Sequence, residues 1–303
     1  MISLTRSIAA WVAASALLAL GGCASFEYTK AAPKQEQPVT LKAAGDELSG
    51  WTDLPLGVYR VPDSHVIISG HQKGQGAALL FGLVGVAAMH LGNASAGADA
   101  IRAAEQQLHI KLDAPLDAAI RDVIASDHGR AFTLAEQSGQ KKLLVTPALV
   151  LSFVTTDTLR PYVVLKASLV GSDPKPLWTT RYIASTGQPR PLLGEGGWLQ
   201  DDGAELRKAV QTNLSVAMRT LASDVAHPYA RDDERLVMVQ GNFPYIKQRL
   251  QAVGYSLAED DRYLTFIPKL GDVLVFAGIN VFDKSVITFR AANKDDVVFK
   301  LAE

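Results

Sequence analysis

Cysteine is almost absent from this sequence, and so is any excess of charge of one sign. Cys23 is the only thiol in 303 residues, which excludes an internal disulfide and any metal site or redox pair that needs two cysteines. The 30 basic and 31 acidic side chains leave a formal net charge of −1. That balance speaks against nucleic-acid binding and predicts no polybasic patch that would attract anionic lipid.

The usual motifs of catalysis and metal binding are missing as well. No two of the six histidines stand four residues apart, as a helical zinc site requires, and no serine lies in a G-x-S-x-G turn. A short stretch does gather Asp63, Ser64, His65, Ser69 and His71. Strand neighbours such as Ser64 and His65, however, point to opposite faces. We therefore predict no catalytic residue and no metal site.

A glycine-rich loop at Gly194–Trp198 is the remaining candidate for ligand binding. It lacks the Lys-Ser/Thr ending of a phosphate loop. Glu195 and Trp198, flanked by glycines, form a candidate ligand loop in which a mobile indole grips a ligand or partner. The alternative is that Trp198 packs at the tip of the loop.

The N-terminus carries the most specific pattern. Arg6 precedes an apolar run from Ile8 to Leu20, and the segment closes on Leu20-Gly21-Gly22-Cys23, which is the layout of a secretory signal. A cysteine directly after the small residues resembles the lipobox of bacterial lipoproteins. The alternative is an uncleaved membrane anchor, although the apolar run is shorter than the roughly 20 residues that span a bilayer.

The lipobox resemblance implies a modified N-terminus and a location in the cell. Cleavage would fall between Gly22 and Cys23, and Cys23 would carry a diacylglycerol thioether and an amide-linked acyl chain such as palmitate. That covalent lipid is the only non-protein group we predict, so no cofactor is expected. Ala24 stands where lipoproteins kept at the inner membrane usually carry Asp, so the resemblance implies the outer membrane, with the body in the periplasm.

Composition and periodicity divide the chain and predict an α+β fold: an antiparallel meander with packed helices, and a smaller α+β module at the C-terminus. Residues 24–50 are polar and carry two prolines, which predicts a flexible tether. Strands are predicted near 57–61, 65–69 and 108–112, and a meander over 143–185. Helices are predicted at 115–127 and 202–226, the second capped by Asp202. The predicted parts are a signal peptide (1–22), an acylated N-terminus and tether (23–50), the body (51–230) and a βαββββ module (231–303) whose helix begins at Pro244.

One segment of the body, 74–98, has no formally charged residue. Small residues recur on one face of a helix drawn through it, which would allow another helix to approach closely. Three interpretations stay open: a helix of the core, an assembly helix that contacts a partner or a second copy, and membrane insertion. The predicted assembly face consists of Ala78, Gly82, Gly85, Ala88 and Gly92.

The layout of 143–226, three strands and a long helix behind a lipobox, is similar to that of curli-secretion-class outer-membrane lipoproteins. The hairpin Leu169–Trp178 carries the likeness, which brings no functional residue with it. We predict a non-enzymatic binding or assembly role in the cell envelope. The partners would be the membrane, through the lipid, and an envelope protein or a second copy, but no nucleic acid. A periplasmic hydrolase of envelope polymer and a subunit of an export complex are the alternatives.

Overall fold

The computed structural model describes residues 28–44, 51, 54–55, 57–71, 96–135, 140–173, 175–269 and 276–302. Two of the predictions lie outside these ranges. They are the signal peptide with its lipobox (Leu20 to Cys23) and the assembly face (Ala78, Gly82, Gly85, Ala88 and Gly92). Within the described part of the chain, no helix combines the length and the apolar character needed to cross a bilayer.

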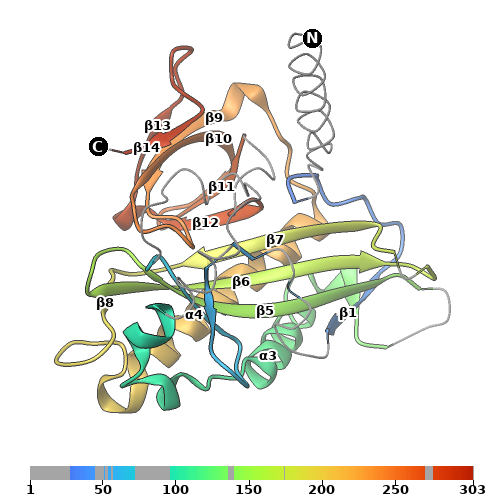
Figure 1. Cartoon of the computed structure of the whole chain (residues 1–303). Helices are drawn as coiled ribbons and strands as arrows, with labels where there is room; N and C mark the ends of the chain where they lie inside the picture. Colours follow the sequence, from blue (N-terminus) through green and yellow to red (C-terminus); the bar gives the residue numbers. More distant parts are fainter. Residues whose placement is uncertain are drawn as a thin grey trace, which may run out of the picture.

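The fold is α+β, as predicted, and strands dominate it (Figure 1). The strands of the described residues join in one mixed sheet. They are β1 (Val39–Ala43), β2 (Tyr59–Arg60), β3 (Val66–Ser69), β4 (Phe132–Thr133), β5 (Lys142–Phe153), β6 (Thr158–Val170), β7 (Trp178–Ser185), β8 (Arg190–Pro191), β9 (Leu236–Gly241), β10 (Leu250–Glu259), β11 (Tyr263–Pro268), β12 (Ile279–Asp283), β13 (Thr288–Ala291) and β14 (Phe299–Leu301). The longer helices are α3 (Asp113–Ile124) and α4 (Gln200–Ala226), and the 3₁₀ turns are η2 (Glu105–Leu108), η3 (Gly129–Ala131), η4 (Asp233–Arg235) and η6 (Lys284–Val286).

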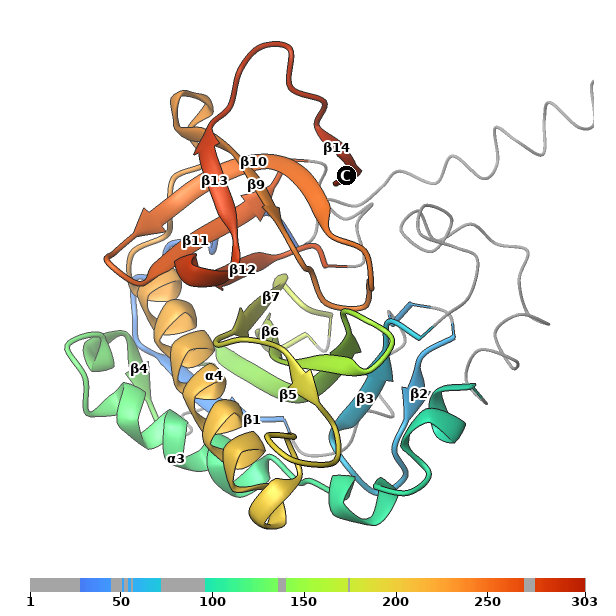
Figure 2. The same cartoon turned by 90° about the vertical axis from the view of Figure 1, so that its left-hand side faces the viewer.

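The centre of the molecule is the antiparallel meander β5–β6–β7, which the sequence predicted. Figure 1 shows α3 and α4 on one face of these strands, and Figure 2 shows β9 to β13 curving over the other. The result is three layers: helices, meander and C-terminal strands. A sheet covered on both faces has to be apolar on both faces.

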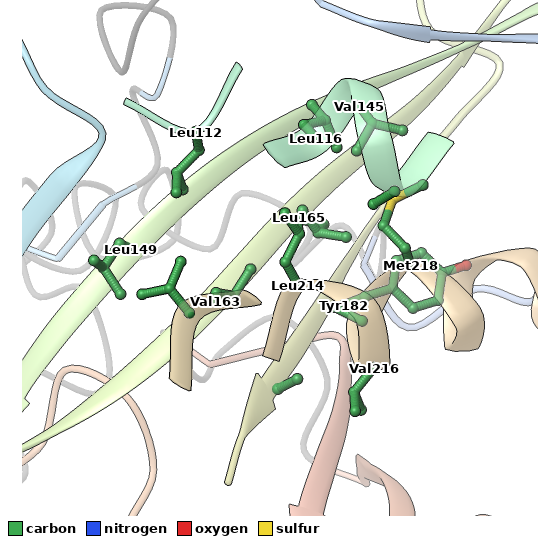
Figure 3. Close-up of a cluster of buried hydrophobic side chains, with 14 of the residues drawn as sticks. Leu112, Leu116, Val145, Leu149, Val163, Leu165, Tyr182, Leu214, Val216 and Met218 are labelled. Carbon is green, nitrogen blue, oxygen red and sulfur yellow. The ribbon is translucent and has the colours of Figure 1, made fainter. Parts of the chain in front are cut away.

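Strand β6 contributes side chains to two hydrophobic clusters, one on each face of the sheet. Val163 and Leu165 pack on the helix side with Leu214 and Met218 of α4 (Figure 3). Val164, between them, belongs to a second cluster on the opposite face, with the phenylalanines of the C-terminal strands. The strand is half-buried, as predicted, only over its last residues, from Lys166 onward. Before that point it is buried on both faces, because the C-terminal strands cover the face that we expected to be exposed.

Pro147 lies at the point where β5 changes partners. Its presence predicted that the strand would be an edge strand or would break, and both predictions are wrong. Along one side of β5, β1 pairs up to Val145 and β3 begins to pair at Leu149. Pro147 falls in the gap between them. A residue without an N–H is tolerated there because neither β1 nor β3 pairs with it on that side of β5.

The predicted flexible tether is wrong for residues 28–44. Strand β1 lies within the sheet, parallel to both β4 and β5. Val39 and Leu41 are each 1% exposed. Two apolar side chains were too few to reveal a strand in a polar segment. Parallel pairing to a strand a hundred residues away decides the conformation here.

Both predicted helices of the body exist, and they pack as expected. The inward stripe of α4, from Leu206 to Val225, is buried against the meander and α3. The predicted cap at Asp202 is wrong, because Asp201 and Asp202 have positive φ angles of 51° and 56° and no side chain caps the helix start.

The hairpin β2–β3 also forms as predicted, with Asp63 in its turn at a φ of 50°. Residues 109–112, a predicted strand, are irregular.

The C-terminal module differs from its prediction in its helix and in the pairing of its last strands. No helix begins at Pro244: residues 244–249 are irregular and β10 follows them. Apolar residues at 246, 250 and 253 fit a helix, but β10 is extended because β9 and β11 pair with it on both sides. Gly254, the predicted helix stop, is instead a point of close approach, since an added Cβ would lie 2.0 Å from the Ile267 carbonyl oxygen.

The short connections Asp283-Lys284 and Ala291–Lys294 predict hairpins between the last strands, and neither hairpin forms. Strand β13 pairs with β9, and β14 pairs with β10. Strand β12 runs parallel to β7, which joins residues 231–303 to the body through one continuous sheet.

Candidate functional site at the N-terminal clamp

The first described residues are held on the body by side chains that we call the N-terminal clamp, consisting of Trp178, Thr180, Arg181, Asp224 and Arg231. Each backbone carbonyl from residue 28 to residue 30 accepts a hydrogen bond. The donors are Thr180 Oγ1 to Tyr28 (2.6 Å), Arg231 Nε to Thr29 (3.3 Å), and Trp178 Nε1 (3.1 Å) with Arg231 Nη2 (3.3 Å) to Lys30. The segment that precedes β1 is therefore fixed to the beginning of β7.

The aromatic ring of Tyr28 adds a contact of a different kind. The guanidinium carbon of Arg181 lies 4.0 Å from the centre of this ring, which is the geometry of a cation–π interaction. Arg181 itself is only 4% exposed. A cation that is largely withdrawn from water gains more from an aromatic face than an exposed one does.

A buried carboxylate organises the inner half of the clamp. Asp224 is 0% exposed. It accepts hydrogen bonds from the Tyr182 hydroxyl at 2.9 Å and from the Tyr229 backbone N–H at 3.0 Å, and Arg231 Nη1 lies 3.9 Å from it. Arg231 thus connects the charge of Asp224 to the carbonyls of the N-terminal segment. A buried carboxylate is tolerated when charge and hydrogen bonds compensate it in this way.

Burial also shifts the ionisation of these groups. It raises the pKa of Asp224 above its ordinary value, against the opposing effects of the Tyr229 N–H, Arg231 and Tyr182. It lowers the pKa of Arg231, with Asp224 acting in the opposite direction. The pKa of Tyr182 is raised well above its ordinary value, by burial first and by the charge of Asp224 second. At neutral pH Tyr182 is therefore a hydrogen-bond donor.

A groove with a volume of about 430 Å³ lies between α3 and α4. Its apolar lining includes the exposed Pro115 and Ala118 and the buried Leu112 and Leu214, and Lys111 and Arg207 are among its polar lining residues. A mostly apolar concavity with a few polar groups is the general composition of a binding site. None of the residues that line it was predicted from the sequence to bind a ligand.

Ser64 and His65, two of the residues gathered in 63–71, each hydrogen-bond to backbone groups. Ser64 Oγ donates to the Val61 carbonyl at 2.8 Å and accepts from the Val66 N–H. His65 Nδ1 accepts from the Leu112 N–H at 3.0 Å. Both side chains therefore fasten β3 to neighbouring backbone. Across the described ranges, no three His, Asp or Glu side chains gather as metal ligands would.

Trp198 is part of the core. Its side chain is 3% exposed, Nε1 donates to the Leu159 carbonyl at 2.8 Å, and Arg190 lies over the ring at 5.1 Å. The ligand loop predicted at Glu195 and Trp198 is therefore wrong for the indole, and the alternative, a packed loop tip, is confirmed. Glu195 is exposed. The structure does not bring the two side chains into one site.

Sequence reasoning missed the clamp. Tyr28 was assigned to a tether, and Arg231 to a charged boundary between domains. One signal was present: Asp224 is a charged residue between Leu221 and Val225 on the mainly apolar stripe of a helix. A charged residue at such a position predicts a buried partner.

Comparison with known proteins adds nothing to this picture, because no family, no curated protein and no solved structure matches the chain. The likeness to curli-secretion-class lipoproteins stays a prediction.

Proposed function

We propose that this chain is an outer-membrane lipoprotein, anchored through acylated Cys23, with a non-enzymatic binding or assembly role in the periplasm. The sequence Leu20-Gly21-Gly22-Cys23 is the basis of the anchor. One structural observation supports it: the chain is fixed to the body at Tyr28, five positions after Cys23. A folded body that begins directly behind the lipidation site suits a protein carried by its N-terminus.

Acylation supplies the membrane affinity in this proposal. Each buried methylene of an acyl chain contributes about 0.8 kcal/mol, and two or more chains hold a protein stably at a bilayer. The groove between α3 and α4 supports the binding role, because the exposed Pro115 and Ala118 are among its lining residues and give a partner apolar surface to contact.

The test of the anchor is the chemistry of the mature N-terminus. Mass spectrometry of the protein from a bacterial host should find Cys23 as the first residue, carrying a diacylglycerol and an acyl chain. Cys23→Ala should leave the precursor uncleaved by the lipoprotein peptidase. Normal maturation of Cys23→Ala to the same size would exclude the lipobox.

The test of the binding role is crosslinking in intact cells. A photo-reactive residue at Ser215 in the groove should capture an envelope protein or a second copy of the chain, and one at the exposed Glu195 should not. If the chain is recovered without a crosslinked partner from both positions, the groove gives no support to the binding role.

A further inference from the structure

The position of Tyr28 limits how far the body can stand from the membrane. This inference rests on the proposed acylation of Cys23. Five residues extended at about 3.6 Å each reach at most about 18 Å, and the carbonyl oxygen of Tyr28 is fixed on Thr180. The end of the sheet where β7 begins must therefore lie near the lipid headgroups. The predicted tether, by contrast, would have let the body turn freely.

The surface at this end of the sheet contains an exposed leucine on a short hairpin. Residues 171–177 connect β6 to β7, and Leu177 is 57% exposed. Its backbone N–H donates to the Leu169 carbonyl at 2.8 Å, which holds the side chain beside Trp178 of the clamp. A fixed, exposed apolar side chain close to a lipid anchor is well placed to enter the membrane interface.

Lysines from three separate segments lie at the same end of the sheet as this leucine. Lys175 is exposed on the same hairpin, and Lys30 and Lys34 are exposed on the N-terminal segment. Lys141 precedes β5, where Lys142 stands opposite Val170 at the end of β6, and Lys141 Nζ contacts Gln35 Oε1 at 3.2 Å.

The acidic residues of the same segments are Glu36 and Asp173. Asp173 Oδ1 is engaged by the Lys175 backbone N–H. Lysines therefore outnumber carboxylates within these three segments, whereas Asp232, Asp233 and Glu234 follow Arg231 of the clamp. A whole-chain balance of charge does not reveal lysines that only the fold brings together.

We propose that this surface, which we call the lysine end (Lys30, Lys34, Lys141, Lys175 and Leu177), docks on the phospholipid bilayer that holds the acyl chains. Leu177 enters the interface, and the lysines lie at the level of the phosphates. Anionic lipid attracts such a cluster, and the attraction falls off within a Debye length. The anchor then fixes the orientation of the body as well as its location.

The opposite end of the sheet provides a matched control position. Leu193 is also an exposed leucine, at 44%. It follows β8, whose residue Pro191 pairs with Thr158 at the start of β6. Strand β6 has 13 residues, which corresponds to roughly 40 Å between its ends. Docking through the lysine end therefore brings Leu177 to the bilayer and keeps Leu193 away from it.

The experiment uses the mature, acylated protein in vesicles of phosphatidylethanolamine and phosphatidylglycerol. Leu177→Cys and Leu193→Cys each add one free thiol, because Cys23 is blocked by its lipid, and each thiol is labelled with an environment-sensitive fluorophore. Nitroxide-labelled lipid should quench the label at 177 several-fold more than the label at 193. The triple variant Lys30→Gln, Lys141→Gln, Lys175→Gln should reduce the quenching at 177.

A lysine elsewhere on the surface controls for charge. Lys247→Gln, whose lysine contacts Thr156 Oγ1 in the connection between β5 and β6, should leave the quenching at 177 unchanged. Matching circular-dichroism melts show that each variant is folded. Equal quenching at 177 and 193 on an acylated protein would overturn the docking and leave the proposed anchor intact. An N-terminal mass without lipid would overturn both.

Discussion

The hydroxyl of Tyr182 donates a 2.9 Å hydrogen bond to the carboxylate of Asp224, and both side chains are fully withdrawn from solvent. Tyr182 comes from the centre of the meander and Asp224 from the last turns of α4. The bond therefore links the sheet to the helix that covers it. Because Arg231 approaches the same carboxylate and holds the carbonyls of Thr29 and Lys30, the link extends to the first described residues of the chain.

Removing the carboxylate should be costly. Asp224→Ala leaves the Tyr182 hydroxyl without its acceptor and Arg231 without its nearby charge, and breaking such a buried pair costs about 3–5 kcal/mol. Asp224→Asn keeps an acceptor and should cost less. The measurement is the free energy of unfolding in urea. Glu195→Ala, at an exposed carboxylate, should stay within about 0.5 kcal/mol of the parent. Equal effects of the two alanine variants would show that the clamp carboxylate contributes nothing.

Releasing the N-terminal segment should expose it to proteolysis. Arg231→Ala removes the side-chain donor to the Thr29 carbonyl and one of the two side-chain donors to the Lys30 carbonyl, so the segment should open more often and trypsin should cut after Lys30 faster. The readout is the rate of appearance of the fragment that begins at Ala31, at a protease concentration that leaves the body intact. Arg235→Ala, at an exposed arginine in the same charged run, is the control. An unchanged rate in Arg231→Ala would mean that other contacts hold the segment.

An ion pair in the C-terminal strands should make stability depend on pH in the acid range. Arg290 donates to both carboxylate oxygens of Asp296 at 2.7 and 2.6 Å. The hydrogen bonds from Arg290, followed by that from the Asn293 N–H, lower the pKa of Asp296 from 3.8 to about 2.

The direction of this effect follows from which form the fold prefers. The folded chain favours the carboxylate, so the contribution is fully present above pH 3.8 and is lost as the pH falls through about 2. Urea midpoints between pH 5 and pH 2 should fall less steeply for Asp296→Asn than for the parent. Identical slopes would contradict the pKa assigned here. The neighbouring Asp295→Asn, at an exposed carboxylate, is the comparison.

Several elements could be predicted from local sequence because short-range physics determines them. The meander formed as expected, since alternating apolar residues around Val163 and Leu165 fix the faces of a strand. The stripe from Leu206 to Val225 likewise predicted the buried face of α4. The turn at Asp63 was visible as a proline followed by an aspartate between two apolar runs.

The elements that were missed all depend on distant partners. Apolar residues at 246, 250 and 253 suit a helix in isolation, and only pairing with β9 and β11 makes β10 a strand. Strand β1 has little apolar content of its own and is ordered by pairing with β5. Sequence patterns report the preferences of a segment, whereas sheet pairing depends on which other segments are near.

The same division holds for function. The sequence alone determined the predicted address, because a peptidase and an acyl transferase recognise a short linear stretch ending at Cys23. It also determined that one thiol is the only candidate for lipidation. The clamp and the lysine end were decided by the tertiary structure alone. Tyr28 is far from Asp224 and Arg231 in the chain, and Lys30, Lys141 and Lys175 are far from one another, so only long-range packing brings their charges and hydrogen bonds together.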